Sequence, residues 1–371
     1  MNRRHKILVV FGTRPEAIKL APVVDELKKD SSLDTIVCVT AQHREMLDQV
    51  LDVFSIVPDY NLDIMVEDQT PLDVTVSVCD KLPQVLNDVR PAWTIVQGDT
   101  TTAFVSALVA FHHRLPVAHV EAGLRTGNPY EPFPEEMNRK LLADVADLHF
   151  APTQQSVHNL LHEGVRETEV CLVGNTIVDA LIKVIQRRQA PADKRLIDLE
   201  GTMVLVTMHR RENLGEPLRR VCKLMSELAD SHDDITIIFQ VHRNPVVTKC
   251  VNEIIPKNPR IILTEPLDYV SFVHLMRRAS LIMTDSGGIQ EEVTVIGTPT
   301  LVMRNITERP EALECDWIKL VGTSRERLLN ESNLILARGK RPFIDMTSSP
   351  FGDGHASQRI VRILKDKLLL T

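Results

Sequence analysis

The sequence lacks long apolar runs and has no excess of basic residues. None of its 371 residues lies in a stretch approaching the roughly 20 apolar residues of a membrane-spanning helix. The basic residues near the start precede only the short apolar run 7–11, which is too brief for a signal peptide. Lys and Arg number 43 against 50 Asp and Glu, a net charge of −7 that leaves no surplus of cations for nucleic-acid phosphates. We expect a cytoplasmic protein with no membrane or nucleic-acid partner.

Cysteine pairs and metal-binding patterns are also missing. The six cysteines are scattered without a C-x-x-C motif, and we interpret them as reduced structural thiols. His158 and His162 have a spacing that could hold zinc, but no third ligand is evident. The one G-x-G, at 352–354, follows no predicted buried strand and so does not match a dinucleotide-binding fingerprint. The sequence therefore predicts neither a metal nor a nicotinamide cofactor.

The chain does contain an alternation of short β-branched apolar runs with longer helical patterns, which is typical of a parallel sheet. The predicted strands are 7–11, 35–40, 93–97, 117–120, 148–151, 170–173, 203–207, 235–241, 260–263, 281–284, 300–303 and 318–321. They form two similar series, which favours two doubly wound domains of the α/β class. Since ligands of such sheets bind at the carboxyl ends of the strands, the residues after each strand are the candidate functional residues.

A candidate anion site follows the first predicted strand. Thr13 and Glu16 have the spacing of a capping box, and a helix that begins after a Gly turn presents backbone N–H groups to an anion. Arg14 and Lys19 would add two cations at the same place. The alternative is a well-capped helix with two solvated charges.

Three carboxylates follow other strands of the first half. Asp99 comes after 93–97, Glu121 comes after 117–120, and a proline-rich loop leads to Glu135 at the start of a helix. Such clusters occur where pKa values are separated for acid–base chemistry. The alternative is a set of helix caps and salt bridges, with Asp99 as an ordinary N-cap.

The second half offers a candidate nucleotide site. Strand 281–284 leads to the run DSGGIQEE, in which Gly287 and Gly288 open a helix whose N-terminus could hold a diphosphate. Glu292, two turns later, could accept from ribose hydroxyls, and Arg309 supplies a cation after the next strand.

Several motifs taken together resemble a known family. These are FGTRPEAIK (11–19), TAQHREMLDQVL (40–51), GDTTT (98–102), HVEAGLRTG (119–127), PEEMNR (134–139), GNT (174–176), HRREN (209–213), DSGGIQEE (285–292) and TERPE (307–311). In this order they are similar to the non-hydrolysing UDP-N-acetylglucosamine 2-epimerases of bacteria and archaea, over residues 6 to about 360. The resemblance implies an isomerase that converts UDP-GlcNAc to UDP-ManNAc, a precursor of cell-surface polysaccharides, without NAD or a metal.

The resemblance also implies an architecture. It is the GT-B fold, with two Rossmann-like domains and the substrate in the cleft between them, commonly as a homodimer. The C-terminal segment of the family crosses back onto the N-terminal domain. We therefore expect residues 1–170 with 353–371 to form the N-terminal domain, and 171–352 to form the UDP-binding domain.

Residue roles follow from the resemblance, position by position. Asp99, Glu121, Glu135 and His209 match the catalytic residues. The substrate contacts are matched by Arg14, Lys19, Ser286, Gly287, Gly288, Glu292 and Arg309. Bacterial members resemble one another in a site for a second, activating UDP-GlcNAc, which is matched here by Gln42, His43, Gln69, Glu136, Arg210 and His242.

The sequence departs from the family pattern in a few places. Met208 replaces a small residue directly before His209, Gln240 replaces a proline, and Glu131 replaces a serine. None of these removes a proposed catalytic group, but they bear on sugar specificity and on activation.

Three other functions stay open at this point. A hydrolysing relative would release ManNAc and UDP with the same carboxylates. A GT-B glycosyltransferase would need an acceptor pocket, which nothing in the sequence marks. A catalytically silent UDP-sugar sensor would not need all four catalytic positions.

Overall fold

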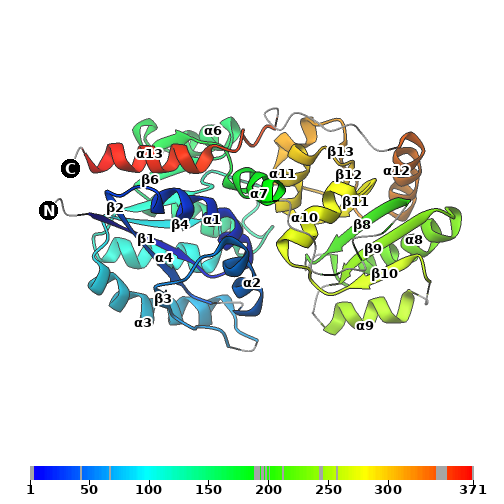
Figure 1. Ribbon diagram of the computed structural model, residues 1–371, viewed down its shortest axis with the longest axis horizontal. Helices are drawn as coiled ribbons and strands as arrows, with labels where there is room; N and C mark the ends of the chain where they lie inside the picture. The colour runs from blue at the N-terminus through cyan, green and yellow to red at the C-terminus, as the bar shows by residue number, and fades with distance from the viewer. Residues whose placement is uncertain are drawn as a thin grey trace. The chain divides into compact units, whose positions relative to one another are not determined.

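The computed structural model describes residues 4–41, 44–66, 68–187, 193, 196, 199, 201–210, 213–241, 245–255, 258–339 and 349–369, with the side chains of 44–46 and 245–246 excepted. The chain divides into two compact units, Met1–Ile182 with Phe351–Thr371, and Lys183–Pro350. Each unit contains one parallel sheet with helices packed on it (Figure 1).

In the first unit, the described residues form a seven-stranded sheet with strand order β3-β2-β1-β4-β5-β6-β7. Its strands are β1 (His5–Phe11), β2 (Leu33–Val39), β3 (Tyr60–Asn61), β4 (Trp93–Gln97), β5 (Val117–Val120), β6 (Leu148–Ala151) and β7 (Val170–Leu172). The helices that begin in this unit are α1 (Arg14–Lys28), α2 (Arg44–Phe54), α3 (Pro71–Val89), α4 (Thr101–His112), α5 (Glu135–Val145), α6 (Gln154–His162), α7 (Thr176–Arg187) and α13 (Ala356–Leu368). The strand order reverses between β1 and β4, and ligands of doubly wound sheets bind at such a switch point.

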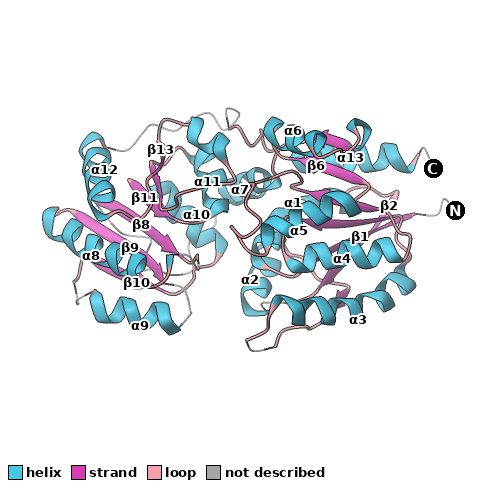
Figure 2. Ribbon diagram, turned by 180° about the vertical axis from the view of Figure 1, so that it is seen from behind, coloured by secondary structure: helices cyan, strands magenta, loops and turns pink. Residues whose placement is uncertain are grey.

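The first sheet is covered by helices on both faces. Leu8 and Val10 of β1 lie in one cluster with the apolar sides of α3, α4 and α5, which lie side by side (Figure 2). The alternate residues of β1, such as Val9, point to the opposite face. There α1 packs between α2 and the C-terminal helix α13. Burial on both faces explains why residues 7–11 of β1 form an unbroken apolar run.

In the second unit, the described residues form a six-stranded sheet with strand order β10-β9-β8-β11-β12-β13. Its strands are β8 (Thr202–Met208), β9 (Ile235–Val241), β10 (Ile261–Thr264), β11 (Leu281–Thr284), β12 (Thr300–Val302) and β13 (Ile318–Leu320). Its helices are α8 (Glu216–Ser231), α9 (Pro245–Ile254), α10 (Tyr269–Arg278), α11 (Gly287–Ile296) and α12 (Arg325–Arg338). The switch point of this sheet lies between β8 and β11.

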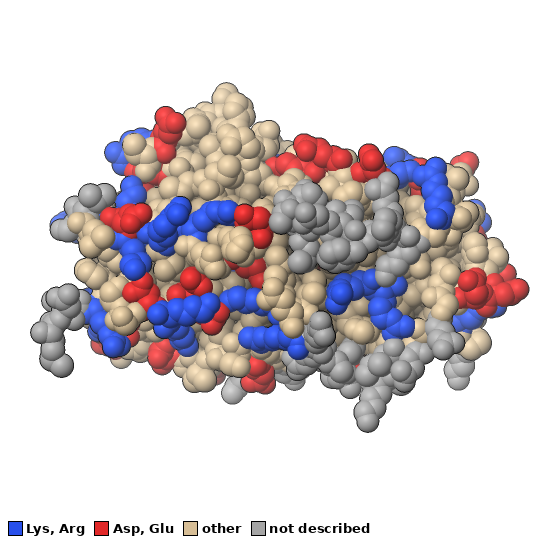
Figure 3. Space-filling view, turned by 45° about the horizontal axis from the view of Figure 1, so that its top comes forward, with Lys and Arg blue, Asp and Glu red and all other residues tan. Residues whose placement is uncertain are grey.

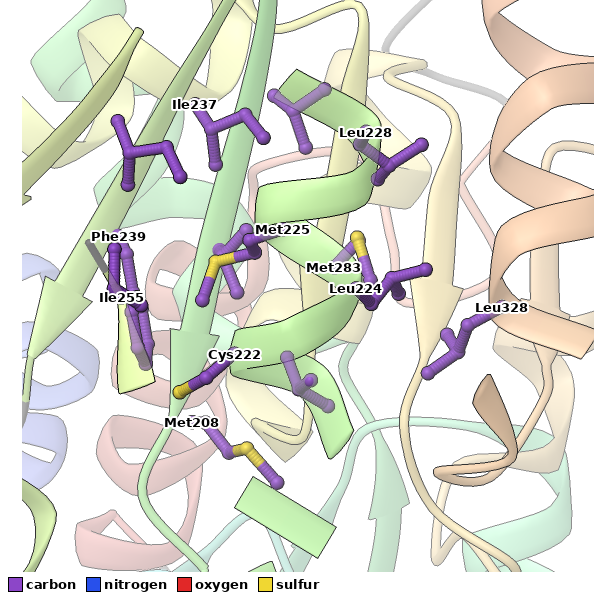
Figure 4. Packing of buried hydrophobic residues seen from close by; sticks show 14 of the residues in the cluster. Met208, Cys222, Leu224, Met225, Leu228, Ile237, Phe239, Ile255, Met283 and Leu328 are labelled. Carbon is purple, nitrogen blue, oxygen red and sulfur yellow. The ribbon is translucent and has the colours of Figure 1, made fainter. Parts of the chain in front are cut away.

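One core cluster of the second unit reaches the end of β8. It joins β8, β9 and β11 to the apolar sides of α8, α9 and α12 (Figure 4). Met208 is 2% exposed and belongs to this cluster with Cys222 and Met225. It shares its face of β8 with Val204 and Val206, because alternate residues of a strand face the same side. The bulk of Met208 therefore fills the core and does not crowd the position beside His209.

The C-terminal helix α13 is fixed to the first unit. Asp179 of α7 accepts hydrogen bonds from the backbone N–H groups of Ala356 (3.2 Å) and Ser357 (2.8 Å) and from the Ser357 hydroxyl (2.5 Å). Arg359 of α13 is also ion-paired with Asp353, which precedes the helix (2.6 Å). Lys, Arg, Asp and Glu side chains are accordingly interspersed on the face shown in Figure 3.

The structure differs from the sequence prediction in several places, apart from shifts of one or two residues at strand ends. The two-residue strand β3 was not predicted, and α7 with β7 belongs to the first unit, which ends at Ile182 and not at residue 170. β7 extends the first sheet because it pairs with β6. All six cysteines were predicted to be structural thiols, but Cys79 is exposed and so does not pack in a core. Within the described residues, no helix is both long and apolar enough to span a bilayer.

Candidate active site

Glu121 lies at the carboxyl end of β5, where three side chains converge on one of its oxygens. Its Oε2 is ion-paired with Lys19 and accepts hydrogen bonds from Gln97 Nε2 (2.9 Å) and Asn175 Nδ2 (3.3 Å). Glu121 is 5% exposed and has a φ of +65°, a strained value for a residue with a side chain. The carboxylate is therefore buried and held in one orientation. Lys19, predicted to contact substrate, is itself buried against Glu121, which rules out the alternative of a solvated charge.

Asp99 lies at the end of the neighbouring strand β4 and is held by a guanidinium. Arg139 of α5 donates to Asp99 Oδ2 from Nε (2.9 Å) and Nη2 (2.6 Å). Asn138 donates to the Asp99 backbone carbonyl (2.8 Å). The N-cap of α4 is Thr100, whose hydroxyl accepts from Ala103 N–H (3.0 Å), so the alternative that Asp99 caps this helix is wrong.

The first turn of α5 contains Glu135 and Glu136, and the two differ in their surroundings. Glu136 is fully buried and accepts from the backbone N–H groups of Thr126 (3.0 Å) and Gly127 (3.0 Å) and from Arg139 Nη1 (2.7 Å). These contacts hold the loop after β5 against α5. Glu135 is half-buried, so it is the more exposed residue of the two.

Glu16 connects the two loops at the switch point of the first sheet. Its Oε2 accepts from Gly12 N (3.0 Å), Thr13 N (2.8 Å) and Thr13 Oγ1 (2.8 Å). Its Oε1 accepts from Thr100 Oγ1 (2.6 Å). The predicted capping box of α1 is confirmed. Burial raises the pKa of Glu16, and the hydrogen bonds offset this only in part. Arg14, in the same turn, is half-buried.

In the second unit, His209 and Asp285 meet at the switch point between β8 and β11. His209 Nδ1 lies 3.1 Å from Asp285 Oδ1, and the backbone N–H of His209 donates to the same carboxylate (3.1 Å). Asp285 also accepts from Arg210 N (3.0 Å) and Asn213 Nδ2 (3.0 Å). Burial alone would raise the pKa of Asp285, but the hydrogen bonds and the charge of His209 lower it to about 2. The His209 side chain is 42% exposed, so Asp285 orients an imidazole that solutes can reach.

Three arginine and two glutamate side chains form a largely buried network beside this pair. Arg309 is ion-paired with Glu291 and with Glu308 (2.6 Å). Arg304 donates to the other oxygen of Glu308 (2.7 Å), and Arg210 approaches Glu308 at 3.5 Å. The guanidinium groups are thereby fixed with their charge largely balanced.

The start of α11 fits closely against this network. A Cβ on Gly287 would lie 2.5 Å from Arg309 Nη1, so only glycine allows the guanidinium to pack here. A Cβ on Gly288 would meet nothing within 4 Å. Ser286 is the N-cap of α11 and makes no side-chain cap, and Glu292 accepts from the Tyr269 hydroxyl (2.7 Å). Of the two glycines, Gly287 is thus explained by packing within the protein.

The predicted activator positions are only partly described. Gln42, His43 and His242 lie outside the described residues. Gln69 is half-buried in the loop before α3. Arg210 lies beside the Asp285 and Glu308 carboxylates.

Sequence reasoning missed the residues that hold the candidate catalytic groups. Gln97 is the last residue of β4. Asn175 and Arg139 lie in the GNT and PEEMNR motifs, but these two residues were given no role. Asp285 directly follows β11, and this position was the signal that could have found it. In the described part of the chain, no three His, Cys, Asp or Glu residues are grouped as metal ligands would be.

The chain is similar to a large set of known proteins. A family profile described as UDP-N-acetylglucosamine 2-epimerase matches residues 25–365. The chain is 47% identical to the UDP-N-acetylglucosamine 2-epimerase of Yersinia pestis, over 97% of this chain and 98% of that protein. It is 44% identical to that of Bacillus subtilis (strain 168), over 98% of this chain and 95% of that protein.

Solved structures give the same result. The UDP-GlcNAc 2-epimerase of Neisseria meningitidis bound to UDP-GlcNAc has a TM-score of 0.91 and 40% identity, with 97% of this chain and 100% of that chain covered. The enzyme of Methanocaldococcus jannaschii in complex with UDP-GlcNAc and UDP has a TM-score of 0.84 and 34% identity, with 97% and 99% covered. The predicted fold class, GT-B-like with two Rossmann-like domains, is confirmed.

Proposed function

The chain belongs to the UDP-N-acetylglucosamine 2-epimerase family, and we propose that it inverts C2 of UDP-GlcNAc without releasing the sugar. The reaction would eliminate UDP to give 2-acetamidoglucal and then add UDP back to form UDP-ManNAc. The observation that carries this proposal is the pair of carboxylates at the ends of the neighbouring strands β4 and β5, Asp99 and Glu121, each ion-paired with a buried cation. The relatives whose structures contain UDP-GlcNAc or UDP support the substrate class.

The chemistry explains why oriented carboxylates are required. The proton on C2 is not α to a carbonyl, so its removal must be coupled to the loss of a leaving group. A base takes this proton, the C1=C2 double bond forms, and the C1–O bond breaks with its electron pair leaving on UDP. The return step delivers a proton to the opposite face of C2 while a UDP oxygen attacks C1. Since no net oxidation occurs, the sequence of steps consumes no redox equivalent.

We assign the proton transfers to Asp99, Glu121 and Glu135. Asp99 and Glu121 are each paired with a cation, Arg139 and Lys19, which fixes the carboxylate in one position as general acid–base catalysis demands. Their strands, β4 and β5, are neighbours in the sheet. The carboxylates thus project from the same edge.

We assign the binding and stabilisation of the leaving group, UDP, to the residues at the switch point of the second sheet. The exposed imidazole of His209, oriented by Asp285, would stabilise charge on the departing diphosphate. Ser286, Gly287 and Gly288 at the N-terminus of α11, with Arg309, would bind UDP. In the first unit, Arg14 is proposed as a substrate contact on the family resemblance alone. Glu292, with Tyr269, would bind the ribose hydroxyls.

Further properties are proposed on the family resemblance alone. The enzyme would act in the cytoplasm as a homodimer and supply ManNAc-type precursors of cell-surface polysaccharide. A second UDP-GlcNAc would activate it through Gln42, His43, Gln69, Glu136, Arg210 and His242. A sigmoidal dependence of rate on UDP-GlcNAc would support activation, whereas a hyperbolic one would count against it.

Proton NMR of the reaction in D2O tests the proposed function. We expect UDP-ManNAc to appear and deuterium to enter C2 of both nucleotide sugars, with no net loss of them. Accumulation of free ManNAc and UDP would instead show the hydrolysing reaction. UDP binding without any reaction would show a sensor.

A further inference from the structure

Asn175 makes contacts in two directions from the turn that precedes α7. Its side-chain Nδ2 donates to Glu121 Oε2 (3.3 Å), and its Oδ1 accepts from Ile177 N–H (3.1 Å). Its backbone N–H donates to the carbonyl of Phe351 (2.7 Å). Asn175 is 2% exposed. One buried residue therefore touches both a candidate catalytic carboxylate and the segment in which the chain returns from the second unit.

The returning segment leaves little space at this contact. Gly352 has a φ of +116°, and a Cβ placed on it would lie 3.1 Å from Gly174 Cα. Gly174 has a φ of +90°, and a Cβ on it would lie 3.3 Å from the carbonyl oxygen of Phe351. A few residues later, Asp179 accepts three hydrogen bonds from Ala356 and Ser357. The start of α7 and the returning segment are thus held together at two places, on either side of Gly354.

The Glu121 carboxylate depends on such partners for its orientation. A side chain with several rotatable bonds is fixed only where its polar atoms are engaged, and three donors share Oε2 of Glu121. Lys19 comes from α1, which packs on the sheet, and Gln97 comes from β4 within the sheet. Asn175 is the donor that is bonded to residue 351, where the chain comes back.

We propose that Asn175 is a positioning residue that aligns Glu121 with respect to the returning segment. It does so through a continuous chain of contacts from the Phe351 carbonyl to the backbone and then the amide of Asn175, and on to the carboxylate. This inference rests on the proposed role of Glu121 in proton transfer. It adds a residue of the GNT motif to the machinery, and it gives the glycines at 174 and 352 a reason beyond packing.

Removing the amide should lower turnover and leave binding intact. Asn175→Ala loses the donor to Glu121, and we expect kcat to fall by roughly 10- to 100-fold, since small misplacements of catalytic groups have such effects. The KM for UDP-GlcNAc and the affinity for UDP should stay near those of the wild type. Asn175→Asp keeps the acceptor for Ile177 but faces Glu121 with a second carboxylate, so its kcat should fall at least as far.

Gln97 provides the matched control. It donates to the same oxygen of Glu121 (2.9 Å) but has no contact with residue 351 among those described. Gly352→Ala would displace the returning segment, because its φ and the space beside Gly174 both disfavour a side chain. Ser357→Ala removes one hydrogen bond to Asp179 and displaces that segment more gently, which keeps the test available if Gly352→Ala does not fold.

Double-mutant cycles on kcat then decide the proposal. We expect the Gly352→Ala and Asn175→Ala effects to overlap, so that the double variant is little worse than Asn175→Ala alone. The Gly352→Ala and Gln97→Ala effects should multiply. The proposal would be overturned if the effects of Gly352→Ala and Asn175→Ala on kcat multiplied in the double variant. It would also be overturned if Asn175→Ala raised the KM and left kcat unchanged. A wild-type enzyme without C2 exchange would instead refute the proposed function itself.

Discussion

Glu16 of the first unit and Asp285 of the second occupy corresponding places but behave as opposites. Each is a buried carboxylate at the switch point of its sheet, and each joins the loops that follow two adjacent strands. Glu16 joins the loops after β1 and β4, and Asp285 joins those after β8 and β11. The pKa of Glu16 is raised, whereas the pKa of Asp285 is lowered to about 2.

The difference comes from the donors. Burial raises the pKa of both carboxyls, and backbone N–H groups lower it in both. The other partners of Glu16 are the neutral hydroxyls of Thr13 and Thr100, while Asp285 faces the imidazole of His209. A buried carboxylate with several hydrogen-bond donors thus fixes a turn in the first unit and orients a reactive side chain in the second.

Neutralising the two carboxylates should differ most in its effect on enzyme activity. Asp285→Asn removes the charge that orients and stabilises the His209 imidazole, and we expect kcat to fall by roughly 100-fold, the scale of acid–base contributions. Glu16→Gln should leave kcat close to that of the wild type, because an amide can keep both the acceptor for Gly12 and Thr13 and a contact with Thr100. Steady-state kinetics measure both. Equal losses of kcat in the two variants would show that the two carboxylates have the same role in the reaction.

A smaller effect is expected on stability in acid. Asp285 contributes stability that is present above its unfolded pKa of 3.8 and is lost as the pH falls toward about 2. Glu16 has the opposite sign, since a raised pKa makes ionisation costly as the pH rises above 4.5. Asp285→Asn should therefore flatten the rise of the unfolding free energy with pH below pH 3.8, and Glu16→Gln should remove a fall of the unfolding free energy as the pH rises above 4.5. Each slope should change by at most about 1.4 kcal/mol per pH unit, the value for one proton.

The chain allows the two units to be followed separately in that experiment. It contains 2 tryptophans, Trp93 in the first unit and Trp317 in the second. Urea unfolding monitored by fluorescence in Trp93→Phe and Trp317→Phe backgrounds would report on one unit at a time. The comparison would be contradicted if Asp285→Asn changed the pH dependence of unfolding of the first unit, or Glu16→Gln that of the second. A slope that changed in the opposite direction would also contradict it.

The sequence predicted the elements well where local signals agree. The strand at 93–97 has the predicted bounds, because a β-branched apolar run ends there at a Gly turn. β3 could not be predicted, since two residues carry no periodicity. The end of the first unit was placed at 170, because pairing of β7 with β6 is a tertiary contact that no local pattern encodes.

The site was predictable in its carboxylates but not in their partners. Asp99 and Glu121 are found by their position after a strand. The donors to Glu121 come from positions 19, 97 and 175, and only the folded sheet brings these together. The pairing of His209 with Asp285 likewise spans 76 positions of the chain.

Positional isotope exchange is the most direct test of the proposed cleavage of the C1–O bond. UDP-GlcNAc would carry oxygen-18 in the bridge between C1 and the β-phosphorus, and both nucleotide sugars would be recovered after many turnovers. We predict that the label appears in non-bridging positions of the β-phosphate, because a freed diphosphate can rotate before C1–O forms again. Complete epimerisation with all of the label still in the bridge would contradict elimination and re-addition.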